Sequence, residues 1–144
     1  MKIVWIALVW AFTVSVFTVG HWVSENDIWL FLYCFTFIVA ITIPFDIRDI
    51  DYDSKSFRTI PQLIGEVPAR FLGFALIWVS FFLVVLIIDE YSLFLSLVYG
   101  IFSIIVLGAT SNRKELYFSG IMDFTLVFAF ISHWVYSSIE IFHF

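Results

Sequence analysis

The sequence predicts an all-α integral membrane protein with about five transmembrane helices. Of its 144 residues, 62% are hydrophobic and only 13% are charged, whereas an average soluble domain contains roughly 25% charged residues. A soluble protein of this length and composition would have too little polar surface to cover its core. The apolar residues also form long runs, and each run approaches the roughly 20 residues that a helix needs to cross a bilayer.

Five apolar stretches are expected to form these helices, as parts of one membrane domain over residues 1–144. Many of their residues are β-branched or aromatic, but a lone strand in lipid would leave its backbone groups unpaired. Their length and the lack of strict alternation favour helices over a β-barrel. Pro44 and Pro61 are expected to mark points where helix gives way to loop. The approximate ranges are 3–20, 28–45, 71–88, 92–109 and 116–138.

The first stretch has a second interpretation as a secretory signal peptide, because Met1 and Lys2 precede an apolar run. The run is longer than the apolar core of a typical signal peptide, and no small-x-small cleavage site follows it. A membrane helix is therefore the preferred interpretation.

The basic residues all fall on one side of the predicted topology. Residue 2 and the loops 46–70 and 110–115 contain all seven lysines and arginines, and they would lie on the same side. The connections 21–27 and 89–91, on the opposite side, contain none. The positive-inside rule then places the N-terminus and the loop 46–70 in the cytoplasm and the C-terminus outside. In a bacterium the membrane would be the inner, or plasma, membrane.

Charge and cysteine content exclude other classes of site. The formal net charge of −5 does not favour nucleic acid as a partner, because nucleic acid requires a basic face. Cys34 is the single cysteine, so the chain has no internal disulfide and no cysteine-built metal site.

One segment, residues 46–61, collects charge between the second and third apolar stretches. Asp49 and Asp53 are four residues apart, and Asp46 precedes Asp49 by three, so a continuing helix would place these three carboxylates on one face. Converging carboxylates repel one another, and a bound divalent cation removes that repulsion. Mg²⁺ commonly takes one or two carboxylates together with substrate phosphates. The segment is therefore a candidate magnesium and diphosphate site at the membrane surface.

The basic residues of the same segment fit a diphosphate ligand. Lys55 and Arg58 follow the acids and Arg48 precedes Asp49. Arginine can hold phosphate oxygens with its forked donors and lysine as a point charge. A second interpretation stays open, because aspartate–arginine pairs at a membrane boundary can also satisfy one another and form a merely solvated loop.

The order of residues in Arg48-Asp49-Ile-Asp-Tyr-Asp53-Ser-Lys55-Ser-Phe-Arg58-Thr59-Ile-Pro61-Gln-Leu-Ile-Gly65 resembles the second aspartate-rich motif of the UbiA superfamily of intramembrane prenyltransferases. Asp49 and Asp53 match the paired aspartates of that motif, and Asp46 matches a frequent Asn or Asp one turn earlier. Lys55 and the pair Arg58-Thr59 match its basic, threonine-containing run. The resemblance covers about twenty residues, and the five expected helices would correspond to helices five to nine of the family's nine.

The resemblance implies Mg²⁺-dependent transfer of a prenyl group from a prenyl diphosphate to an acceptor. It also implies that Asp49, Asp53 and Asp46 hold the metal and that Lys55, Arg58 and Arg48 hold the diphosphate. Two features depart from the family pattern. The glycine usual between the second aspartate and the threonine is missing, and nothing before Asp46 resembles the family's first aspartate-rich motif.

Three hypotheses follow from this partial match. The chain can be part of a prenyltransferase completed by a missing N-terminal half, by a partner carrying the first motif, or by self-association. It can be a non-catalytic relative that binds isoprenoid, metal or lipid headgroups in the bilayer. It can also be a structural membrane subunit.

A further acidic residue, Asp123, lies inside the fifth apolar stretch. An ionisable residue within the membrane is a candidate functional residue, so Asp123 could reach the same cavity as the charged segment. Its proximity to Arg113 and Lys114 gives the alternative of an interfacial charge pair.

Overall fold

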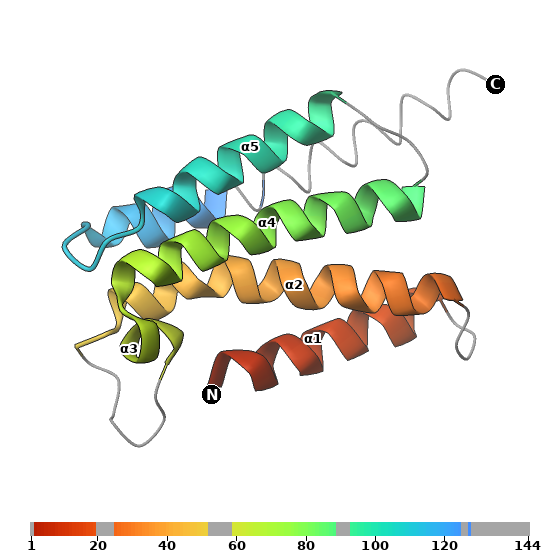
Figure 1. Ribbon diagram of the computed structural model, residues 1–144, viewed down its shortest axis with the longest axis horizontal. Coiled ribbons are helices and arrows are strands. Elements are labelled where there is room, and N and C mark those ends of the chain that lie inside the picture. The colour runs from red at the N-terminus through yellow and green to blue at the C-terminus, as the bar shows by residue number, and fades with distance from the viewer. Residues whose placement is uncertain (1, 20–24, 52–58, 89–92, 125–126, 128–144) are drawn as a thin grey trace. The chain divides into compact units, whose positions relative to one another are not determined.

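The computed structural model of the chain describes residues 2–19, 25–51, 59–88, 93–124 and 127 (Figure 1). These described residues form helices and turns and include no strand, which confirms the predicted all-α class. The chain forms two compact units, Met1–Asn112 and Arg113–Phe144, which we describe separately. The prediction of a single membrane domain stays a prediction.

The described residues of the first unit form five helices. They are α1 (Lys2–Val19), α2 (Glu25–Arg48), α3 (Ile60–Ile64), α4 (Glu66–Ile88) and α5 (Leu93–Gly108). Within this unit α2 packs between α1 and α4, and α5 packs on α4 (Figure 1). The short α3 contacts both α2 and α4. The C-terminal end of α2 and the N-terminal end of α4 therefore lie at the same end of the unit, where α3 joins them.

The four long helices occur where the apolar stretches predict them, but α2 and α4 extend further into the charged sequence. The observed α2 begins three residues earlier and ends three residues later than the predicted 28–45. The observed α4 begins at Glu66 rather than near residue 71. The described stretches Ile28–Arg48 and Glu66–Ile87 are long and apolar enough to cross a membrane, while Ile3–Ser15 and Leu93–Gly108 are apolar but shorter.

Two prolines behave differently from expectation. Pro44 lies inside α2, which continues to Arg48, and Pro61 lies at the start of α3. Pro44 has no N–H to donate to the carbonyl of Ala40 one turn earlier. Gly73 of α4 lies beside that carbonyl, since a Cβ at Gly73 would be 3.5 Å from the Ala40 oxygen. A proline is tolerated here because a neighbouring helix covers the interrupted turn.

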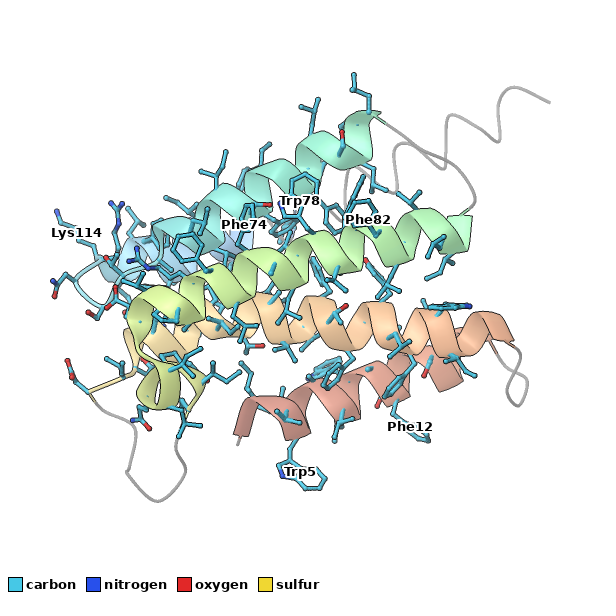
Figure 2. All side chains as sticks on the ribbon, in the orientation of Figure 1. Trp5, Phe12, Phe74, Trp78, Phe82 and Lys114 are labelled. Carbon is cyan, nitrogen blue, oxygen red and sulfur yellow. The ribbon has the colours of Figure 1, made fainter. Side chains whose placement is uncertain are left out.

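The inward face of α1 carries mostly small side chains, and its outward face carries large apolar ones. In α1, Ile3, Ala7, Ala11 and Ser15 recur every four residues and are buried. The opposite side carries Trp5, which is 70% exposed, together with Val9, Trp10 and Phe12. Figure 2 shows Trp5 and Phe12 pointing away from α2. Small residues at these positions allow the helix backbones to approach closely.

An aromatic cluster joins α2, α4 and α5. The Phe37 ring packs edge-on against Phe102 with centroids 5.6 Å apart, and the Phe81 centroid lies 5.4 Å from that of Tyr99. The Tyr99 hydroxyl donates a hydrogen bond of 3.2 Å to the Tyr33 hydroxyl. These contacts assign part of the phenylalanine-rich sequence to packing between helices.

The second unit is helical over residues 115–124, and it includes a π-helix, η1 (Tyr117–Met122). This helix begins where the fifth apolar stretch was predicted to begin. Residues 125, 126 and 128–138 of that stretch lie outside the described residues.

Candidate functional site

The candidate site is the charged C-terminal end of α2. Asp46 lies in the last turn of the helix, and Arg48 is its final residue. The Asp49 N–H still donates to the Phe45 carbonyl at 3.0 Å, and residues 49–51 then form a turn. Helical geometry therefore extends as far as Asp49 and brings Asp46 and Asp49 to one face, as predicted.

The other part of the predicted site follows the turn at residues 49–51. Asp53, Lys55 and Arg58 lie outside the described residues, within the range 52–58. The expected continuation of the α2 helix beyond Asp49 is not observed, because residues 49–51 form a turn. The predicted pairing of Asp49 with Asp53 on one helical face therefore stays a prediction.

Arg48 and Asp49 form a two-point ion pair. The Arg48 Nε donates to Asp49 Oδ1 at 2.6 Å, and Nη2 donates to Oδ2 at 2.9 Å. The Arg48 guanidinium also lies 5.6 Å from the centroid of the Phe45 ring. Both side chains are about one-third exposed, so water weakens the pair but does not remove its geometry. This contact is the one that the alternative interpretation, a self-paired loop, predicts.

The described carboxylates have the donor chemistry of a magnesium site but do not complete one. Asp46 is half-buried and Asp49 lies one turn beyond it, so two oxygen-donor groups share this end of α2. Mg²⁺ commonly takes one or two protein carboxylates with water and phosphate oxygens in its remaining positions. Within the described ranges no group of three or more His, Cys, Asp or Glu side chains could hold a metal ion. Asp46 and Asp49 therefore fit Mg²⁺ as a partial ligand set.

Gln62 fixes the chain on both sides of the range 52–58. Its Nε2 donates to the Ile50 carbonyl at 3.2 Å, and its Oε1 accepts from the Thr59 N–H at 3.1 Å. Thr59, Ile60 and Pro61 are buried beside it. Gly65, with φ of 90°, then turns the chain from α3 into α4. A Thr-x-x-Gln spacing is a helix-start signal, so the capping role of Gln62 is visible in the sequence.

A second cluster of polar contacts at this end of the unit links α4 to the C-terminal end of α5 and to the residues that follow it. The Glu66 carboxylate accepts from the Ser111 hydroxyl at 2.9 Å, and Arg70 Nη2 lies 4.0 Å from Glu66 Oε1. Arg70 Nη1 donates to the Leu107 carbonyl at 3.2 Å, in the last turn of α5. A cation at a helix C-terminus and an anion at a helix N-terminus both interact favourably with the partial charges of the helix dipole. We call these four residues the Glu66–Arg70 clasp.

Sequence reasoning missed the clasp because two of its three contacts join residues that are far apart along the chain, although Glu66 and Arg70 themselves are four residues apart on α4. Glu66 and Ser111 are separated by 45 residues, and Arg70 and Leu107 by 37. Their spacing carries no local signal. The clasp joins the N-terminal end of α4 to the C-terminal end of α5.

Asp123 belongs to the second unit and lies at the C-terminal end of η1. Its side chain is exposed, and its N–H donates to the Gly120 carbonyl. Phe124 beside it is 70% exposed. The predicted sharing of a cavity between Asp123 and the α2 carboxylates stays a prediction, since the two residues lie in separate units.

A scan against protein-family models, a search of curated proteins and a search of solved structures each found no match to this chain. The resemblance to the UbiA superfamily therefore depends on the residues of the segment 48–65 themselves.

Proposed function

We propose that the chain is an integral membrane protein with five spanning helices, a cytoplasmic N-terminus and an external C-terminus. The outward-facing apolar side chains support this proposal. Trp5, Phe71, Phe82 and Ile104 are each more than 60% exposed, on three different helices. A bilayer would cover these side chains, whereas water would not. Labelling of single introduced cysteines from either side of the membrane tests the orientation; external labelling at residue 51 would contradict it.

Within that membrane protein, we propose that the charged end of α2 binds a prenyl diphosphate with Mg²⁺, as part of a prenyltransferase. The observation that carries this proposal is the placement of Asp46 and Asp49, one turn apart, at the end of an apolar helix. The residue order from Arg48 to Gly65 adds Asp53, the partner of Asp49 in the motif, and the basic residues expected of such a site. A partner, a further segment or a second copy would supply the missing first aspartate-rich motif.

Each residue would have a defined task in this proposal. Asp46, Asp49 and Asp53 would coordinate Mg²⁺, which neutralises the diphosphate leaving group when bound. Lys55 and Arg58 would hold the remaining phosphate charge. Arg48, which the resemblance also assigns to the diphosphate, would orient the Asp49 carboxylate through their two hydrogen bonds. The apolar surroundings would exclude water from the reactive prenyl group.

A structural role is the second candidate, and the Arg48–Asp49 ion pair favours it. In that case Arg48 and Asp49 neutralise each other's charge. Replacing the aspartates by neutral residues would then leave the function of the membrane assembly unchanged. A non-catalytic relative lies between the two candidates, since it would bind prenyl diphosphate without releasing diphosphate.

The variants Asp49→Ala and Asp53→Ala are expected to abolish Mg²⁺-dependent release of diphosphate from a prenyl diphosphate by the full chain combined with its complementing partner. Removing a metal-ligating carboxylate lowers the rate by orders of magnitude when the metal stabilises the leaving group. The matched control is Asp51→Ala, an exposed acid in the same segment that is expected to retain turnover. Undiminished turnover in both Asp49→Ala and Asp53→Ala would exclude the proposed role of this segment in the reaction.

A further inference from the structure

Two exposed cations, Arg113 and Lys114, immediately precede the helix of the second unit. The Tyr117 N–H donates to the Lys114 carbonyl at 2.9 Å, so the helix begins directly after the pair. The Arg113 guanidinium lies 5.3 Å from the centroid of the Tyr117 ring. The two cations and this amphipathic ring therefore lie together at one end of the helix.

Beyond this end, the helix exposes large apolar side chains. Leu116 is 73% exposed, Phe124 is 70% exposed and Val127 is 53% exposed. Lysine and arginine near a helix end extend their charged groups toward the headgroup layer while their stems lie on apolar surface. Tyrosine rings favour the same depth. The chain order of the two cations, Tyr117 and the exposed side chains of Phe124 and Val127 thus follows the order of layers at a membrane surface.

We propose that Arg113 and Lys114 bind the phosphate headgroups of anionic phospholipids in the cytoplasmic leaflet. The inference rests on the proposed membrane location but not on prenyl diphosphate binding. Phosphate oxygens complement the forked donors of arginine and the charge of lysine. Binding by an acidic soluble protein would account for the cations but not for the exposed apolar side chains that follow them.

The acidic residues of this unit weaken the attraction between the two cations and anionic headgroups. Glu115 follows the pair directly, Asp123 lies further along the helix, and both are exposed. In the proposed topology the cytoplasmic loop 46–70 carries both basic and acidic residues. Because attraction between charges falls off within about 10 Å at ordinary salt, the part of a lipid preference that depends on Arg113 and Lys114 is local to them.

Lipid selectivity can be measured on the full chain reconstituted in phosphatidylcholine vesicles, with spin-labelled phosphatidylglycerol or phosphatidylcholine as the probe. The wild type is expected to immobilise phosphatidylglycerol preferentially at low salt. The double variant Arg113→Gln/Lys114→Gln is expected to lower that preference by about fivefold or more. Glu115→Gln is expected to raise it, and the charge-preserving exchange Arg113→Lys/Lys114→Arg is expected to retain it.

Equal immobilisation of the two lipids by the wild type, or an unchanged preference in the double variant, would overturn the assignment. If the two lipids are immobilised equally while a polyglutamate peptide binds in a salt-sensitive manner, Arg113 and Lys114 would instead be a binding site for an acidic protein. The fraction of phosphatidylcholine that the double variant immobilises, together with its circular dichroism spectrum, shows whether this variant is folded. If it is not, Glu115→Gln and the charge-preserving exchange still decide the question. The assay contains neither Mg²⁺ nor prenyl diphosphate, so its outcome is independent of the proposed enzymatic role.

Discussion

Replacing Gly73 by leucine is expected to destabilise the first unit by about 3 kcal/mol, the upper part of the range for overpacking a well-packed core. A Cβ at Gly73 would lie only 2.7 Å from Val106 Cγ1 and 3.5 Å from the Ala40 carbonyl oxygen. Val106 is fully buried and cannot move toward solvent. The added side chain would therefore separate α4 from α5 and from the proline-interrupted turn of α2. Unfolding by titration with a denaturing detergent, followed by circular dichroism, measures the loss.

Gly100 provides the matched control, since a Cβ there would meet nothing within 4 Å. Gly100→Ala is expected to be neutral or to stabilise α5 by up to about 1 kcal/mol, because alanine favours the helix. The pair Gly73→Ala/Val106→Ala is expected to recover part of the stability lost in Gly73→Ala alone. Equal stability of Gly73→Leu and the wild type would show that α4, α2 and α5 are not packed as described.

Replacing Arg70 by methionine is expected to lower the free energy of unfolding by about 1.5–3 kcal/mol, the range for hydrogen bonds to charged groups. Methionine retains apolar bulk but cannot donate to the Leu107 carbonyl or approach Glu66 as a cation. The loss also leaves the Glu66 carboxylate with less compensation for its partial burial. The same detergent titration measures this change.

Lys114→Met removes the same charge from an exposed side chain and is expected to change stability by less than about 0.5 kcal/mol. A double-mutant cycle of Glu66→Gln with Arg70→Met isolates the coupling energy between these two side chains. A coupling energy near zero, with additive single losses, would mean that the ion pair at 4.0 Å contributes nothing and that only the contact to Leu107 matters.

The positions of the long helices could be predicted from the sequence because apolar run length is a direct signal for them. Their ends could not, since hydropathy falls at the first charged residue while backbone hydrogen bonds continue. This is why α2 includes Asp46 and Arg48 and why α4 begins at Glu66. Pro44 was expected to end α2, but a proline ends a helix only where no neighbouring helix covers the interrupted turn. In this protein Gly73 lies against that turn.

The shared face of Asp46 and Asp49 could be predicted from spacing, because helical periodicity determines it. Two other features of this end of the unit could not be predicted in the same way. The two hydrogen bonds from Arg48 to Asp49 depend on rotamers, and the contact of Glu66 with Ser111 joins residues 45 positions apart. Gln62 could be predicted in part: its spacing from Thr59 is a helix-start signal in the sequence, but its hydrogen bond to the Ile50 carbonyl is not.

The most direct test of the account is equilibrium binding of a prenyl diphosphate to the full chain in nanodiscs, with and without Mg²⁺. We expect saturable binding that requires Mg²⁺, that falls at least about tenfold in Asp49→Ala, and that is retained in Asp51→Ala. Binding that is absent in the wild type, or unaffected by both Mg²⁺ and Asp49→Ala, would contradict the assignment of the charged end of α2 as a diphosphate site.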